Sequence, residues 1–200
     1  MTHPTSFHET APSGPTADLA ARFQALIPVL ETDRLILRAP RIEDFDGFAT
    51  MVCGERGTYF GHPGTRADAW QGFMQITGTW ALRGHGAWAV TDRATGTLLG
   101  FVQLGAEPGD LEPELGWIVS AEAEGKGIAH EAAEAVRAHA LGAFALPSLV
   151  SYIDARNTRS CTLADRLGAR RDPAAEAAIA GLQDDGEHCV VYRHQMPEGR

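Results

Sequence analysis

Hydrophobic positions near the start of the chain alternate with polar ones and then recur at helical spacing. In residues 31–38, Leu35 and Leu37 point to one side and the residues beside them to the other, which predicts a strand that Pro40 ends. Apolar residues are then three or four positions apart in residues 41–52 and again in residues 68–82. This spacing is typical of two amphipathic helices.

The rest of the chain continues as a meander of three strands, a long helix, a strand, a helix, another helix and a last strand. These elements are expected in residues 86–91, 98–104, 112–120, 127–144, 149–153, 158–167, 173–182 and 188–194. No internal repeat and no second hydrophobic core is evident. We therefore expect one mixed α/β domain over residues 28–196, preceded by a tail, residues 1–27, whose residues 17–27 form a short helix able to dock on the domain.

The composition adds limits on size and partners. The chain has 200 residues, 44% hydrophobic and 22% charged, which suits one domain with a sizeable core. Its formal net charge of -9 argues against a nucleic-acid binder, for which a basic patch is expected. An acidic surface attracts amines or cationic peptides, although the same charge is also that of an ordinary soluble enzyme.

Cysteine and hydropathy patterns indicate the compartment. Cys53, Cys161 and Cys189 are far apart and odd in number, and no Cys/His spacing of a zinc site occurs. No apolar run approaches the ~18 residues of a membrane span. The N-terminus also lacks the basic and apolar regions of a secretory signal. We expect a cytoplasmic protein without a metal, bound neither to membrane nor to nucleic acid.

The segment that carries recognisable chemistry is Gly125-Lys126-Gly127-Ile128-Ala129, at the start of the long helix. A helix N-terminus presents unpaired N–H groups and the positive end of the helix dipole, so it binds phosphate oxygens. Gly125 and Gly127 have no side chain to keep a pyrophosphate away from the backbone. Lys126 could add a cation.

Two familiar nucleotide motifs do not fit this loop. A Walker loop needs Ser or Thr after the lysine to hold magnesium, and Gly127 stands there. A dinucleotide fingerprint needs a third glycine or alanine where this chain has His130. Phosphoryl transfer through a P-loop is therefore a remote alternative.

The loop resembles instead the pyrophosphate loop of the GNAT superfamily of acetyltransferases, Arg/Gln-x-x-Gly-x-Gly/Ala, with Glu124 in place of the leading Arg or Gln. Flanking segments resemble the ribosomal-protein-alanine acetyltransferase (RimJ/RimL-like) branch of that superfamily. They are the strand Glu114-Leu115-Gly116-Trp117-Ile118-Val119, the pair Asn157-Thr158-Arg159-Ser160 and Leu167-Gly168-Ala169, and residues 30–38. Together they cover about residues 30–195 in the family's order.

The resemblance implies the GNAT fold, a mixed, mostly antiparallel twisted sheet with helices on both faces, and acetyl-CoA as acyl donor. Its pyrophosphate would lie at the helix start, on Gly125, Lys126, Gly127, Ile128, Ala129 and His130. Its pantetheine arm would enter a gap between strands 114–120 and 149–154 and pair with main-chain groups of Trp117, Ile118 and Val119. Asn157 would contact the cofactor, and it is equally suited to cap its own helix.

The resemblance also implies catalytic roles. Glu114 would accept the proton of the attacking amine, directly or through water, with Glu112 on the same face as the alternative. Ser160 would protonate the departing thiolate, and its alternative role is to cap its own helix. Cys161 suggests a covalent intermediate, but no His–Asp pair is evident beside it, so a buried helix cysteine is the favoured interpretation.

The acceptor is expected to be a primary amine, either a protein N-terminus or a small molecule, with direct transfer in a ternary complex. Trp70, Trp80, Trp88 and Tyr59 are candidates for the acceptor pocket or for the ordinary core. Relatives often pair, so a homodimer is one expected assembly. The alternative function is a non-catalytic acyl-CoA sensor or partner-binding module on the same fold.

Overall fold

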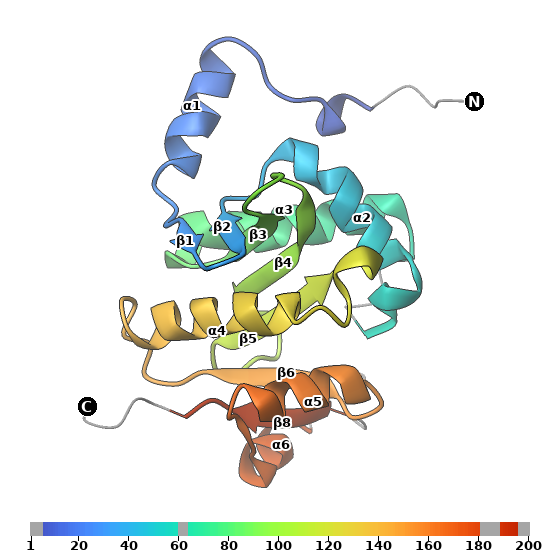
Figure 1. Ribbon diagram of the computed structural model, residues 1–200, viewed down its shortest axis with the longest axis vertical. Coiled ribbons are helices and arrows are strands. Elements are labelled where there is room, and N and C mark those ends of the chain that lie inside the picture. Colours follow the sequence, from blue (N-terminus) through green and yellow to red (C-terminus); the bar gives the residue numbers. More distant parts are fainter. Residues whose placement is uncertain (1–5, 60–63, 181–188, 196–200) are drawn as a thin grey trace.

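The computed structural model describes residues 6–59, 64–180 and 189–195. Within them one eight-stranded sheet runs in the order β1-β2-β3-β4-β5-β6-β8-β7 (Figure 1). Its strands are β1 (Leu30–Glu31), β2 (Leu35–Arg38), β3 (Ala87–Asp92), β4 (Leu98–Gly105), β5 (Glu114–Val119), β6 (Val150–Asp154), β7 (Arg170–Arg171) and β8 (Cys189–Arg193). Every neighbouring pair is antiparallel except β5 with β6, which is parallel. The predicted mixed, mostly antiparallel sheet is confirmed.

Helices cover both faces of this sheet (Figure 1). They are α1 (Pro15–Gln24), α2 (Phe45–Cys53), α3 (Arg66–Arg83), α4 (Ile128–Leu141), α5 (Thr158–Arg166) and α6 (Pro173–Ile179), with short 3-10 turns η1 (Phe7–Glu9), η2 (Ile42–Asp44), η3 (Glu55–Tyr59) and η4 (Ala121–Ala123). On one face Val136 of α4 packs against Leu115 of β5. On the other, Phe48 of α2 and Phe73 of α3 pack against Ile118 of β5.

Local sequence explains where the main helices begin and end. Thr65 and Asp68 form a reciprocal capping box at the start of α3, and Gly84 ends that helix with a left-handed φ of 72°. Asn157 caps α5 through its side chain. These caps satisfy backbone groups that the helix ends leave unpaired.

The strand predicted over residues 31–38 is instead two strands, β1 and β2, that pair with each other. The turn between them is closed at Thr32, whose N–H donates to the Leu35 carbonyl at 3.0 Å and whose hydroxyl accepts the Leu35 N–H at 3.0 Å. A threonine side chain that bonds to nearby backbone in this way favours a turn over continued strand. Such local competition is not visible in the hydrophobic alternation.

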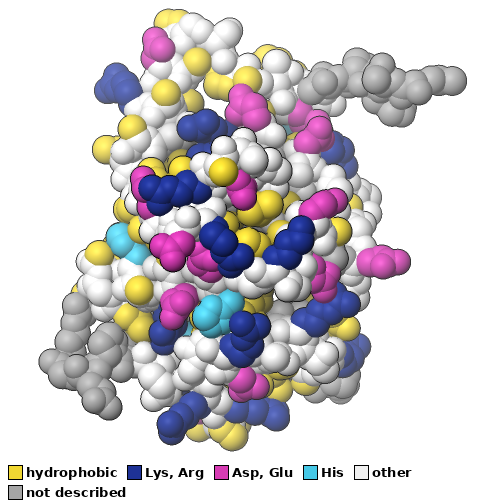
Figure 2. Space-filling view, viewed as in Figure 1, with side chains coloured by type: hydrophobic (Ala, Val, Ile, Leu, Met, Phe, Trp, Pro, Cys, Tyr) yellow, Lys and Arg dark blue, Asp and Glu magenta, His cyan; other side chains and the backbone are white. Residues whose placement is uncertain are grey.

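The N-terminal helix forms, but it is not docked as predicted. None of the residues of α1 is buried: Leu19 within it is 63% exposed, and Leu26 just after it is 80% exposed. Figure 2 shows apolar atoms on the surface of this part of the molecule. The chain contacts the domain on either side of this helix. Before it, Glu9 accepts two bonds from the Arg66 guanidinium of α3, at 2.9 and 2.8 Å. After it, Ile27 is buried and the Pro28 carbonyl accepts the Trp88 indole N–H at 2.7 Å.

The C-terminal elements match the predicted order within the described ranges. Helix α6 ends at Ile179. The last two residues of the predicted helix 173–182 lie outside the described part of the chain, and so does His188 of the last predicted strand. The two-residue strand β7 was not predicted, because two arginines carry no strand pattern. In the described part of the chain no helix is both long and apolar enough to cross a lipid bilayer.

Candidate active site

The strands β5 and β6 part immediately after they meet. Their only paired position is Glu114 with Val150, next to a bond from the Val150 N–H to the Pro113 carbonyl at 3.1 Å. Beyond this point the Leu115 carbonyl accepts the Ser151 hydroxyl at 2.6 Å rather than a β6 backbone N–H. The sheet therefore opens between the two strands, as predicted.

Backbone alternation decides which groups of β5 face this opening. The Ser120 N–H donates to the Leu99 carbonyl beside β4 at 2.8 Å, and the Leu115 carbonyl faces β6. Because main-chain groups alternate between the two neighbours of a strand, those of Trp117 and Val119 face the opening. Those of Ile118 face β4, which corrects the prediction that all three residues offer main-chain groups there.

The side chains of β5 alternate between the two faces of the sheet. Ile118 packs with α2 and α3, so Glu114, four residues earlier, lies on the same face. Trp117 packs on the other face, with Leu115 and with residues around α5. The opening thus has Glu114 on one side and the start of α5 on the other.

The glycine loop before α4 has the backbone of an anion site. Gly125 and Gly127 have φ of 71° and 77°, the left-handed region that glycine adopts without strain. The Glu131 N–H makes the first helical bond, to the Gly127 carbonyl at 3.1 Å. The N–H groups of residues 128–130 therefore point out of the helix end. A Cβ on Gly125 would meet no atom within 4 Å, so the space beside it is open.

This loop is held in place by side chains that the sequence analysis did not single out. Arg34 donates through Nη1 to the Lys126 carbonyl at 3.0 Å and pairs with Glu131 of α4, Nε to Oε2, at 2.7 Å. Glu124 forms an ion pair with Arg159 of α5. The residue that departs from the family motif therefore ties the loop to the helix that carries Ser160.

The side chain of His130 is engaged elsewhere. Its Nε2 lies 3.3 Å from the Arg166 carbonyl, and its Nδ1 lies 4.0 Å from Glu134. The imidazole thus links α4 to the end of α5. Any contact of His130 with a phosphate would come from its backbone N–H.

Asn157 and Ser160 lie together at the start of α5. The Asn157 side-chain oxygen accepts the Ser160 N–H at 3.2 Å, which is the capping role expected of it. Both residues also line the cavity described below. The Ser160 hydroxyl oxygen accepts the Trp117 indole N–H at 3.3 Å, an interaction that the sequence did not predict. Since that oxygen is an acceptor here, its own proton is free to point into the cavity.

Glu114 occupies an unusual electrostatic environment. Burial raises its pKa well above the ordinary value, and the nearby carboxylates of Glu107 and Asp110 raise it further. The Tyr152 backbone N–H and the Gln103 amide donate to it and oppose this shift. A carboxyl whose pKa is raised toward neutrality is suited to accept a proton and release it.

The alternative base, Glu112, is a structural residue. Its carboxylate makes two bonds of 2.7 Å to the Arg193 guanidinium of β8, and this partner lowers its pKa. Cys161 packs beside Tyr192, and burial raises its thiol pKa, which opposes formation of a nucleophilic thiolate. Neither residue lines the cavity among the described residues.

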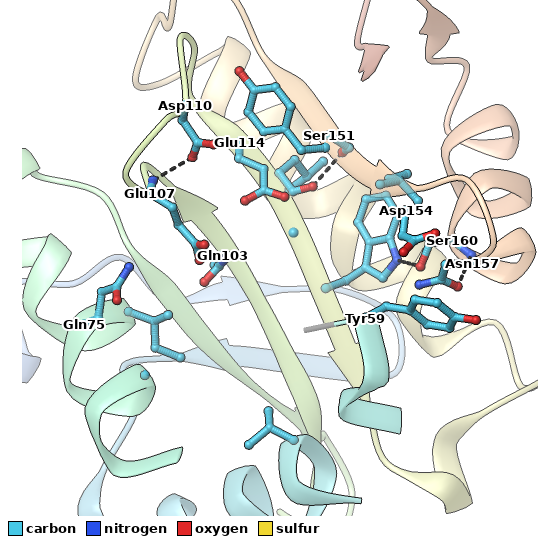
Figure 3. Close-up of a pocket in the computed structure, with 18 of the residues that line it drawn as sticks. Tyr59, Gln75, Gln103, Glu107, Asp110, Glu114, Ser151, Asp154, Asn157 and Ser160 are labelled. Atoms are coloured by element: carbon cyan, nitrogen blue, oxygen red, sulfur yellow. Dashed lines mark hydrogen bonds between the residues drawn. The ribbon is translucent and has the colours of Figure 1, made fainter. Parts of the chain in front are cut away.

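A cavity of about 530 Å³ connects residues of β5 with the start of α5. Glu114, Trp117, Asn157 and Ser160 line it, together with Tyr59 from η3 (Figure 3). Figure 3 shows Gln103, Glu107 and Asp110 on one side, with Asn157 and Ser160 on the other. The three candidate tryptophans belong elsewhere. The Trp80 indole donates to the Ala87 carbonyl and the Trp88 indole to Pro28, while Trp70 packs against Phe45.

Comparisons with known proteins agree with this geometry. The chain matches the family model described as an acetyltransferase (GNAT) domain over residues 34–170. Among solved structures, an acetyltransferase from Agrobacterium tumefaciens str. C58 is 34% identical with a TM-score of 0.77, and the match covers 85% of this chain and 95% of that one.

Two more distant structures share the fold. The acetyltransferase (GNAT family) from Bacillus anthracis is 19% identical with a TM-score of 0.63, over 83% of this chain and 96% of that one. RimL, a ribosomal L7/L12 alpha-N-protein acetyltransferase solved in complex with coenzyme A, is 15% identical with a TM-score of 0.64, over 84% and 98%.

Proposed function

The chain belongs to the GNAT acetyltransferase family, and from this premise we propose that it transfers acetyl from acetyl-CoA to a primary amine by direct attack in a ternary complex. Membership of the family makes it an acyl-CoA-dependent acetyltransferase. The choice of nitrogen as acceptor and the order of events are the proposal. The observation that carries it is the cavity that joins the opening beside β5 to the raised-pKa carboxyl of Glu114.

The residues present fit acetyl-CoA as the donor. The left-handed Gly125 and Gly127 and the outward N–H groups of residues 128–130 suit a pyrophosphate. The outward main-chain groups of Trp117 and Val119 suit the amide-bearing pantetheine arm. Asn157 lines the cavity and is proposed to contact the same arm.

Glu114 is proposed to take the proton of the acceptor amine. An aliphatic amine is protonated at neutral pH and cannot attack until that proton is removed. A carboxylate of ordinary pKa would be a weak acceptor, and the burial of Glu114 strengthens it. Glu114 and Ser160 lie across the opening from each other, so proton removal and proton donation use different sides of it.

Ser160 is proposed to protonate the sulfur that leaves. Its backbone N–H is held by Asn157 and its hydroxyl oxygen by Trp117, which leaves the hydroxyl proton as the group free to donate. The Val119 N–H is proposed to donate to the thioester carbonyl and stabilise the charge that develops on its oxygen. Trp117 is in this scheme a positioning residue.

The test combines binding with turnover. Isothermal titration with acetyl-CoA should show binding, and free-thiol release should appear with at least one amine in a panel of small amines and peptide N-termini. Mass spectrometry of the product should locate the acetyl group on nitrogen. Binding without turnover on any acceptor would contradict the proposal and favour an acyl-CoA sensor.

A further inference from the structure

The acceptor side of the cavity contains acidic side chains without a basic partner. Among the described residues that line the cavity, five are acidic and none is Lys, Arg or His. Two of the five have other roles. Asp68 belongs to the capping box of α3, and Asp154 pairs with Arg156. The remaining three are Glu107, Asp110 and Glu114.

Within the described ranges, the donors to these three carboxyls are neutral. Asp110 accepts the Glu107 backbone N–H at 2.6 Å, and the Gln103 amide donates to both Glu107 and Glu114. Loss of solvent raises the pKa of all three carboxyls, and repulsion by neighbouring carboxylates raises that of Glu107 and Glu114 further. Clustered like charges of this kind cost stability unless a cation joins them.

The loop that carries two of these carboxyls is fixed in position. The Tyr152 hydroxyl of β6 accepts the backbone N–H groups of Leu111 and Glu112, both at 3.2 Å. Glu112 is itself held by Arg193 of β8. The carboxyls of Glu107 and Asp110 are therefore presented to the cavity by a loop tied to the neighbouring strands, which favours specific binding over incidental charge.

Resting on the proposed function above, we propose that the acceptor is a free aliphatic di- or polyamine. Its reacting amine lies at Glu114, and a second ammonium group lies between Glu107 and Asp110. The second ammonium supplies the counter-charge that the lining lacks. A cavity of about 530 Å³ is within the range of small-molecule sites and suits a short flexible chain.

The chemistry of the step is unchanged by the second cation. The free electron pair of the reacting nitrogen forms the new C–N bond, and the C–S bond of the thioester breaks. The ammonium nitrogen loses two protons in all: Glu114 takes one before the attack, and the other replaces the proton that Ser160 gives to the sulfur, which leaves as the thiol of coenzyme A. The second ammonium remains protonated throughout and acts only in binding.

The experiment compares diaminobutane with butylamine as acceptors for the full chain, by thiol release at saturating acetyl-CoA. We expect kcat/KM to be at least about tenfold higher for diaminobutane, equivalent to about 1.4 kcal/mol. The double variant Glu107→Gln/Asp110→Asn should remove the preference through the KM of the diamine. Each enzyme is measured at its own pH optimum, because the variant also lowers the pKa of Glu114.

A matched control removes the same number of charges elsewhere. Asp18 of α1 and Glu43 of η2 are exposed and do not line the cavity. The variant Asp18→Asn/Glu43→Gln should keep the full diamine preference. The single variant Glu107→Gln gives a second reading if the double variant unfolds.

The outcomes separate this inference from the function on which it rests. Equal kcat/KM for the two amines, a preference that survives in the double variant, or faster turnover of peptides with neutral side chains would each overturn the diamine assignment alone. Absence of turnover with every amine would contradict the proposed N-acetyltransferase activity itself.

Discussion

Replacing Gly125 by alanine separates backbone strain from cofactor binding. Gly125 has a φ of 71°, and an alanine in the left-handed region costs about 1–2 kcal/mol. No atom lies within 4 Å of the added Cβ, so no steric clash adds to that cost. For a protein of this length each kcal/mol lowers Tm by about 2–4 °C. We expect Gly125→Ala to lower Tm by roughly 2–8 °C.

The chain offers a matched control in the hairpin between β3 and β4. Gly96 has a φ of 73° and likewise no atom within 4 Å of an added Cβ. Gly96→Ala should therefore lose about the same stability. Only at Gly125 does the new methyl group enter the space assigned to the pyrophosphate, so only Gly125→Ala should weaken acetyl-CoA binding, by about tenfold or more (about 1.4 kcal/mol).

Thermal unfolding and isothermal titration with acetyl-CoA measure the two effects on the same samples. The two variants should match in Tm and differ in Kd. If they bind acetyl-CoA equally well, the pyrophosphate does not lie against Gly125. If Gly125→Ala loses much more stability than Gly96→Ala, the assumption of equal backbone strain is wrong.

Three further predictions concern the cavity and its support. Glu114→Gln should raise Tm near neutral pH, because the raised pKa makes the charged carboxylate unfavourable in the folded state; this gain should vanish below the ordinary glutamate pKa, where both forms are neutral. Trp117→Phe removes the donor to Ser160 and should lower kcat by about two- to tenfold with little change in the KM for acetyl-CoA, and an unchanged kcat would contradict the positioning role. Glu112→Gln should lower the free energy of unfolding by about 0.5–1 kcal/mol at pH values above the lowered pKa of that carboxyl, a modest loss because its partner Arg193 is partly exposed. Its kcat should remain near the wild-type value.

The sequence was sufficient to predict the strand, loop and helix that carry the donor site. Gly125 and Gly127 adopt left-handed backbone directly before the apolar-striped helix α4, and both features have a local physical cause. Asn157 as a helix cap follows from local preference in the same way. These features depend on a few consecutive residues, so pattern and propensity suffice.

The parts that sequence reasoning missed depend on contacts between distant segments. Glu107 and Asp110 lie in a loop without periodicity, and they reach the cavity because Tyr152, about 40 positions later, holds that loop. The tryptophans looked suitable for a pocket because an indole in the core and an indole at a ligand have the same signature. Trp80 and Trp88 are instead anchored by backbone carbonyls.

For helix α1 the sequence predicted a contact that the structure does not have. Its apolar residues have helical spacing, which correctly predicts the helix, but spacing alone does not say whether a face is covered. The exposed Leu19 and Leu26 show that the core of this domain is complete without it. Burial is a property of the assembled fold and cannot be inferred from one amphipathic segment.

Glu114 is proposed to accept the proton of an amine that attacks acetyl-CoA. The most direct measurement is the pH dependence of kcat/KM for the amine in the wild-type enzyme and in Glu114→Gln. We expect the variant to be slower by at least about a hundredfold and to lose the rise in rate that follows ionisation of this carboxyl. A Glu114→Gln enzyme with the wild-type rate and pH profile would contradict the claim.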